Sequence, residues 1–421
     1  MQCDVSPIDI RVDTQEPDRL LWFLLRSTMV LVILFVFFGL WTDMHIPFLG
    51  NFSVREIFWM VLMPVAVLTM YLAPLFWRNV CPLATTSLWY HNLFGKRRLE
   101  KLGLSANTRT GVRGAVYCFL RSRGLVISAI LFFAIIPYRL VSFNADSMAS
   151  FWLLLSVFGA AAVFGALFPV KSGWCTSLCP VAAAEKAYGM NPAFAAKNTR
   201  CHFTDPKSGK LSNCSGCSFN CGDVVEPEHA YWKAESLKVF HDSLNARVRK
   251  AFVAALPGFV SAYFLLSSRW VEFPYAEGAE RVAVIYGFFL VSMSVSAALY
   301  FAAKALIRKW SFRNDPAVCA PELAELPGGQ ESLDEAACNT RYQLGKHRLD
   351  LFFVTLAINV IWFFASSVLV NTFLARVFGF GTEIGAAIWT AAVFGFFFLS
   401  VFGARSGWNE RGPAQYKASW W

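Results

Sequence analysis

The sequence predicts an all-α protein, a polytopic transmembrane helical bundle of about eight helices arranged as hairpin repeats, with one polar, cysteine-rich insertion. Three observations predict this fold class. Of the 421 residues, 56% are hydrophobic and only 16% are charged, which lies outside the usage of ordinary soluble domains. The apolar residues gather into runs close to the roughly 20 residues that a membrane-spanning helix requires. A long polar segment then separates the first four runs from the last four.

The apolar runs follow one another along the chain with polar loops between them. They lie near residues 20–41, 57–77, 124–141, 151–170, 251–267, 282–303, 351–373 and 384–402. The fifth run is short and contains Pro257, so a re-entrant segment is an alternative there. Arg26 lies inside the first run and is interpreted as an anchor that snorkels to the membrane surface.

The distribution of basic residues predicts the orientation of the helices. The loop between the second and third runs is strongly basic, with Arg78, Lys96, Arg97, Arg98, Lys101, Arg109, Arg113, Arg121 and Arg123. Alternate loops are short and poor in lysine and arginine. Because cytoplasmic loops carry the excess of positive charge, we expect a multi-pass protein of the bacterial inner (cytoplasmic) membrane with both termini in the cytoplasm. The net charge of +10 is explained by these loops, so nucleic acid is not expected as a partner.

The predicted domain organisation follows from the runs and the loops. The N-terminal segment, residues 1–19, is predicted to be cytoplasmic. Helices one to four lie within residues 20–170, with a basic cytoplasmic loop at 78–123, and the cytoplasmic insertion follows at 171–250. Helices five to eight lie within residues 251–403, with a cytoplasmic loop at 304–350, and a cytoplasmic tail follows at 404–421.

A degenerate repeat predicts that the helices come in hairpins. The fourth run leads into Lys171-Ser-Gly-Trp-Cys175, and the eighth leads into Arg405-Ser-Gly-Trp-Asn409. The second run ends more loosely in the same way, with Cys81-Pro82. Each hairpin would therefore deliver a motif to the cytoplasmic face, and the copy at Cys175 is the one that keeps its cysteines.

The insertion concentrates the cysteines of the chain. It contains Cys175, Cys179 followed by Pro180, then Cys201, and finally Cys214, Cys217 and Cys221. Spacings of two and three residues let a curling backbone offer neighbouring thiolates to one iron–sulfur cluster, and a cysteine before proline is typical of ferredoxin ligands. We therefore expect a small cytoplasmic ferredoxin-like iron–sulfur insertion that holds at least one [4Fe–4S] cluster.

The grouping of ligands leaves the number of clusters open between one and two. Cys179, Cys201, Cys214 and Cys217 would hold one cluster, and Cys175 and Cys221 would be left for a second. Cys81 is the best further ligand, because Cys81-Pro82 emerges from another helix at the same face. Cys118, Cys319 and Cys338 are weaker candidates. A structural zinc site built from the last three insertion cysteines with Cys201 or His202 is the main alternative, and disulfides are a lesser one in a reducing compartment.

The fourth predicted transmembrane helix is followed by the motif Lys171-Ser-Gly-Trp-Cys175-Thr-Ser-Leu-Cys179-Pro180 and then by the ferredoxin-like cysteine run. This arrangement resembles the NapH/NosR/CcoG type of membrane-bound polyferredoxin. The resemblance is specific over about residues 163–227. It implies cytoplasmic [4Fe–4S] clusters and electron transfer between the quinone pool or a soluble donor and a partner oxidoreductase. It also implies that Cys175 and Cys179 are ligands.

These observations predict an electron-carrier subunit of the membrane rather than a stand-alone enzyme. Its expected partners are membrane lipid, a membrane or soluble redox protein, and quinone as a candidate. No helix carries a histidine near its centre for haem, and no nucleotide-binding motif is present in the sequence. The alternatives from other classes are a metal-stabilised assembly or redox-regulatory factor and, less favoured, a transporter.

Overall fold

In a computed structural model of the chain, eight of the described helices are long and apolar enough to cross a membrane. The structure describes residues 10–11, 19–87, 89, 111–167, 174–175, 178–188, 202–204, 211–213, 244–268, 270–273, 278–311 and 333–408. The eight spans are Leu20–Trp41, Val54–Leu72, Arg123–Phe143, Ser147–Leu167, Arg247–Ser267, Gly278–Trp310, Arg348–Phe378 and Thr382–Phe402. The predicted bundle of about eight apolar helices is confirmed at this level.

The first two spans form a hairpin that turns through a short two-stranded sheet. Its elements are α1 (Arg19–Trp41), β2 (His45–Ile46), η1 (Pro47–Leu49), β3 (Phe52–Ser53), α2 (Val54–Ile57), η2 (Phe58–Leu62) and α3 (Met63–Leu72). Gly50 takes a left-handed conformation, with φ of 72°, which glycine adopts without a steric penalty. Ser53 and Glu56 then cap the start of α2 reciprocally. This turn lies at what we call the hairpin end of the bundle.

The chain returns to the opposite end, which we call the thiol end, through two short helices. The elements from there to the insertion are α4 (Pro74–Val80), α5 (Pro82–Ser87), α7 (Gly111–Tyr138), η3 (Arg139–Phe143), α8 (Ser147–Leu167) and α9 (Ala182–Tyr188). Proline stands at the first position of both α4 and α5, where its missing N–H costs no hydrogen bond. The predicted second run, 57–77, is thus divided between α3 and α4.

The second half of the bundle consists of longer helices. They are α11 (Leu244–Ser267), α12 (Gly278–Ser311), α13 (Leu333–Val368), η6 (Leu369–Leu374), α14 (Ala375–Phe378) and α15 (Thr382–Trp408). The helix α11 is continuous through Pro257, so the fifth apolar run is long enough to cross a membrane. It begins at Leu244 rather than near residue 251. Both α12 and α13 also continue beyond their apolar runs.

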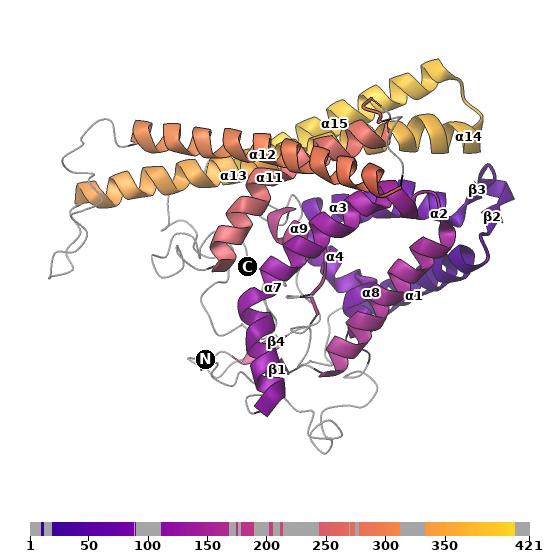
Figure 1. The fold of residues 1–421 in the computed structure, drawn as a ribbon, viewed down its shortest axis with the longest axis horizontal. Helices are drawn as coiled ribbons and strands as arrows, with labels where there is room; N and C mark the ends of the chain where they lie inside the picture. The colour runs from indigo at the N-terminus through magenta and orange to yellow at the C-terminus, as the bar shows by residue number, and fades with distance from the viewer. Residues whose placement is uncertain are drawn as a thin grey trace.

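The core of the protein is centred on α11, which packs against α7, α12 and α13. Figure 1 shows α12 and α13 running side by side above the first half of the bundle. A Cβ atom added at Gly258 would lie 2.1 Å from the Ser292 carbonyl oxygen, so glycine permits the close approach of α11 and α12. The short helix α9 contributes Ala183, Ala187 and Tyr188 to the same core.

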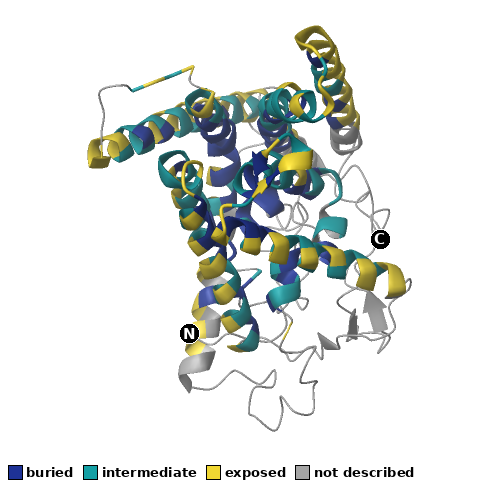
Figure 2. Ribbon diagram, turned by 90° about the vertical axis from the view of Figure 1, so that its right-hand side faces the viewer, coloured by how far each residue is buried: buried dark blue, intermediate teal, exposed yellow. Residues whose placement is uncertain are grey.

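Exposed residues on the outer helices are mostly apolar, as expected for surfaces that face lipid. Figure 2 shows buried residues along the inner sides of the helices and exposed residues on their outer sides. Leu31 and Phe38 on α1, Leu299 on α12 and Phe394 on α15 are all more than half exposed. The structure is therefore compatible with a bundle surrounded by acyl chains.

The described part of the insertion contains two paired strands. A three-stranded antiparallel sheet has the order β1-β4-β5, with β1 at Ile10–Arg11, β4 at His202–Thr204 and β5 at Leu211–Asn213. His202 pairs with Asn213 at the open end of the β4–β5 hairpin. The predicted ligands Cys201, Cys214, Cys217 and Cys221 lie outside the described residues, as does Cys319. Cys118 and Cys338 lie on described helices, but their side chains are outside the described set.

Candidate functional site

Three of the cysteines considered as ligands lie close together at the thiol end. Cys81 lies between α4 and α5, and Cys175 and Cys179 lie in the turn that precedes α9. All three are reduced thiols; Cys81 and Cys179 are buried, and Cys175 is partly buried. The charges of Cys81 and Cys175 both act on Cys179. The structure therefore brings Cys81 to the CxxxCP motif from a separate hairpin.

Close packing of α5 on α8 carries the Cys81 segment to its neighbours. A Cβ atom added at Gly165 would lie 2.0 Å from the carbonyl oxygen of Ser87, so no larger residue fits between the two backbones. The Ser87 hydroxyl in turn lies 3.8 Å from Cys175 Sγ. On the other side of the segment, Arg26 Nε donates to the carbonyl of Asn79 at 3.0 Å. The arginine in the first span thus supports the segment that presents Cys81.

Hydrogen bonds from the backbone and from α7 fix the Cys179 turn. The N–H groups of Leu178 and Cys179 both donate to the carbonyl of Trp174, at 3.1 and 2.9 Å. Ser128 Oγ on α7 donates to the Cys179 carbonyl at 2.8 Å and accepts from the Ala183 N–H at 2.9 Å. This serine is completely buried. It therefore joins the turn to the start of α9 and ties both to a membrane-spanning helix.

The helix α9 anchors the turn in the core of the second half. Tyr188 is 2% exposed, and burial raises the pKa of its phenol above the ordinary value. The helix packs against α7, α11, α3 and α13. The position of Cys179 is consequently set by four helices that lie far apart in the sequence.

The electrostatic environment disfavours three thiolates in the absence of a cation. Burial raises the pKa of the Cys179 thiol well above its usual value, and negative charge on Cys175, Cys81 and, to a smaller extent, Glu185 raises it further. A bound metal ion reverses this effect, because a coordinating thiol is deprotonated outright. The donor set of soft sulfur atoms also suits iron–sulfur clusters and zinc more than hard cations.

An unsatisfied polar atom in the same place supports the fit of such a group. The Trp174 side chain is 3% exposed, and its Nε1 has no hydrogen-bond partner among the described residues. Within the described part of the chain, however, no three His, Cys, Asp or Glu side chains are gathered as a metal site. The described thiols are thus neighbours but not a complete coordination shell. The other expected ligands belong to the insertion.

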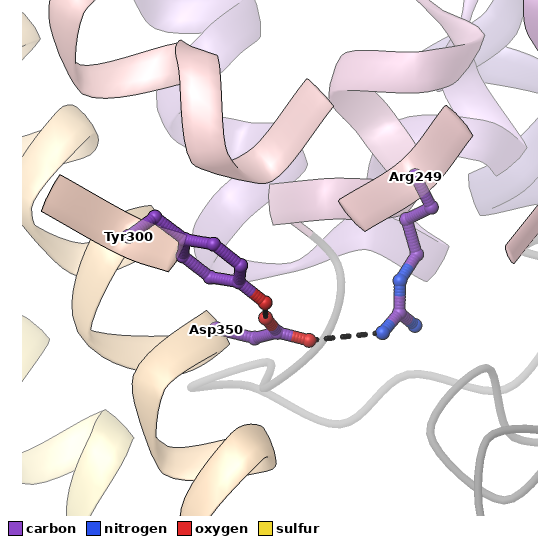
Figure 3. Close-up of polar contacts among 3 residues, drawn as sticks. All are labelled: Arg249, Tyr300 and Asp350. Atoms are coloured by element: carbon purple, nitrogen blue, oxygen red, sulfur yellow. Dashed lines mark hydrogen bonds and ion pairs between the residues drawn. The ribbon is translucent and has the colours of Figure 1, made fainter. Parts of the chain in front are cut away.

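A second buried polar cluster occurs where the sequence predicted only helix ends. Arg249 Nη2 on α11 lies 3.0 Å from Asp350 Oδ2 on α13, and the two side chains are 2% and 1% exposed. Tyr300 on α12 donates to the other carboxylate oxygen, Asp350 Oδ1. Figure 3 shows the carboxylate between the phenol and the guanidinium. We call these three residues the charged triad. The sequence feature that could have indicated it is the position of Arg249 and Asp350 just outside two apolar runs.

Comparison of the chain with family models, with characterised proteins and with solved structures finds no match. The resemblance to membrane-bound polyferredoxins therefore stays a prediction. Sequence reasoning identified the cysteines there. It missed Ser128, Ser87, Gly165 and the charged triad, whose roles depend on contacts between distant segments.

Proposed function

We propose that this chain is a membrane-anchored iron–sulfur electron-transfer protein, which passes electrons between the quinone pool or a soluble donor and a partner oxidoreductase. In this proposal the thiol end faces the cytoplasm of a bacterial cell and both termini lie on that side. The membrane-spanning helices hold the redox centre at a fixed depth beside the lipid.

The observation that carries the proposal is the approach of Cys81 to Cys175 and Cys179. The sequence gives no local reason for Cys81 to lie near the other two, because a long loop and two membrane spans separate them. Structural thiols in apolar cores are ordinarily inert and isolated. Three electrostatically coupled thiols from two chain segments are expected where several thiolates share one cofactor.

The strand register in the insertion supports the participation of two further ligands. His202 follows Cys201 in the chain, Asn213 precedes Cys214, and these two neighbours pair with each other. The β4–β5 hairpin therefore closes the long interval between the two chain segments that carry these cysteines. We propose that Cys175, Cys179, Cys201, Cys214, Cys217 and Cys221 are ligands and that Cys81 assists.

When bound, a [4Fe–4S] cluster supplies one-electron redox chemistry. The chain's own residues would bind and orient it: Ser128 holds the Cys179 turn, and the α5–α8 contact holds Cys81. Trp174 and the apolar residues packed around it, including Ala161, Leu83 and Phe164, would exclude water from the cysteine sulfurs.

The proposal is tested by iron and acid-labile sulfide analysis of the anaerobically purified full-length protein, with electron paramagnetic resonance (EPR) after reduction. Roughly four irons per chain indicate one cubane cluster and roughly eight indicate two. In the Cys179→Ser variant we expect loss of the EPR signal of the cluster that Cys179 holds. Cys81→Ser should change the signal or lower the iron content, because Cys81 lies beside the CxxxCP motif.

The matched control is Cys319→Ser, which removes a thiol outside the proposed ligand set and should leave iron, sulfide and EPR unchanged. Zinc without sulfide in the wild-type protein would overturn the electron-carrier function and favour a structural metal site. Equal retention of the EPR signal in the Cys179 and Cys319 variants would refute the ligand assignment.

A further inference from the structure

Trp174 differs from the other tryptophans whose hydrogen bonds the structure describes. The indole N–H groups of Trp59, Trp89, Trp362 and Trp389 donate to Ser150 Oγ, Ala162 O, Ala392 O and Phe363 O at 2.9 to 3.2 Å. Trp174 is more buried than Trp59 or Trp89. Its N–H nevertheless has no acceptor among the described residues.

A buried N–H without an acceptor loses its hydrogen bonds to water without replacement, which is unfavourable. Proteins rarely retain such a group unless an unseen partner completes it. Trp174 belongs to an apolar cluster whose other described members are alanine, leucine, valine and phenylalanine residues together with Cys175 and Cys179. Among the side chains of this cluster, the cysteine sulfurs are the hydrogen-bond acceptors.

The local backbone places the indole beside the cysteines independently of its packing. Trp174 immediately precedes Cys175, and its carbonyl accepts from the N–H of Cys179 at 2.9 Å. The same residue thus holds the turn through its backbone and presents a buried donor through its side chain. The turn itself is tied to α7 by Ser128, so the segment that carries the indole and Cys179 is held on a membrane-spanning helix.

We propose that the Trp174 indole N–H donates a hydrogen bond to a sulfur atom, thiolate or sulfide, of the cluster that the thiol end binds. This inference rests on the proposed function and deepens it, because it names a residue that tunes the redox centre. Hydrogen bonds to cluster sulfurs are among the factors that set the reduction potential. Such a bond stabilises the reduced form, which carries more negative charge on sulfur, and raises the potential.

The first experiment uses wild-type protein in which the tryptophan indole nitrogens are labelled with ¹⁵N. We expect a ¹⁵N hyperfine coupling to the reduced cluster in pulsed EPR spectra. The coupling should disappear in Trp174→Phe and persist in Trp89→Phe. Trp89 is the matched control, because its indole donates to Ala162 on the neighbouring helix α8 and Ala162 directly follows Ala161, which packs with Trp174.

The second experiment is a redox titration of the same three proteins followed by EPR. We expect the midpoint potential of Trp174→Phe to shift to a more negative value and that of Trp89→Phe to stay at the wild-type value. An intact cluster signal in wild-type protein without ¹⁵N coupling would overturn the role of Trp174 and leave the proposed function standing. Absence of any cluster signal in wild-type protein would overturn both. Because the coupling is measured on wild-type protein, a poorly folded variant does not affect this test.

Discussion

Two buried polar clusters in the described part of the protein differ in how their polar groups are satisfied: the charged triad, and the thiol site formed by Cys81, Cys175, Cys179 and Trp174. In the triad, the Asp350 carboxylate accepts from Arg249 and from Tyr300, so the anion has both a charged and a neutral donor from this chain. In the thiol site, burial and neighbouring charge raise the pKa of Cys179, and the Trp174 N–H lacks an acceptor among the described residues.

We propose that this difference separates a structural network from a binding site. A buried polar group is retained at low cost only when it is hydrogen-bonded. The Asp350 carboxylate on α13 meets this requirement with donors from α11 and α12, so the triad specifies how these three helices pack. In the proposed function, the Trp174 N–H of the thiol site meets it when a cluster binds. Three substitutions sharpen or break this contrast.

The largest effect on stability is expected for Asp350→Ala. Removal of the carboxylate leaves the Arg249 guanidinium charged and buried, and breaking a buried ion pair in this way costs about 3–5 kcal/mol. The apparent midpoint of chemical unfolding in detergent, followed by circular dichroism, should fall accordingly. The double variant Arg249→Met, Asp350→Leu removes both charges and should recover most of the loss. Equal destabilisation of the single and double variants would contradict the assigned role of the pair.

A smaller effect is expected for Gly165→Ala, which tests the packing that carries Cys81. The added Cβ would meet the backbone of Ser87 at 2.0 to 2.7 Å, so α5 must move; overpacking of this kind costs roughly 1–3 kcal/mol. We expect faster alkylation of Cys81 by a small thiol reagent in metal-free protein. Gly159→Ala on the same helix is the control, since its Cβ meets no atom within 4 Å. Identical alkylation rates in the two variants would exclude the proposed positioning.

The smallest effect is expected for Ser128→Ala. The Ala183 N–H loses its bond to the hydroxyl, but the Cys179 carbonyl keeps its bond from the Ala182 N–H. The cost is therefore near the lower end of the roughly 1–3 kcal/mol for an unsatisfied buried group. We expect about a fivefold increase in the alkylation rate of Cys179, measured by mass spectrometry on metal-free protein. The exposed Ser156→Ala on α8 is the control; an unchanged Cys179 rate in both would show that Ser128 does not hold the turn.

The positions of the helices could be predicted from the sequence because hydropathy is a local property. The first, third, fourth and eighth runs coincide closely with observed spans. The fifth run was predicted too short, near 251–267, whereas the observed span is Arg247–Ser267 and contains Arg249. The helix includes this arginine because Asp350, from a span much later in the chain, neutralises it.

The sequence by itself determined the apolar spans, the CxxxCP motif and the cysteines considered as ligands, since each depends on composition or on spacing within a short segment. Only the tertiary structure decided that Cys81 lies beside Cys175 and Cys179, that Ser128 holds their turn, and that the Trp174 N–H is buried without an acceptor in the described chain. The physical reason is that proximity, burial and hydrogen-bond satisfaction are properties of pairs of residues brought together from different helices. Residue type and local spacing do not contain that information.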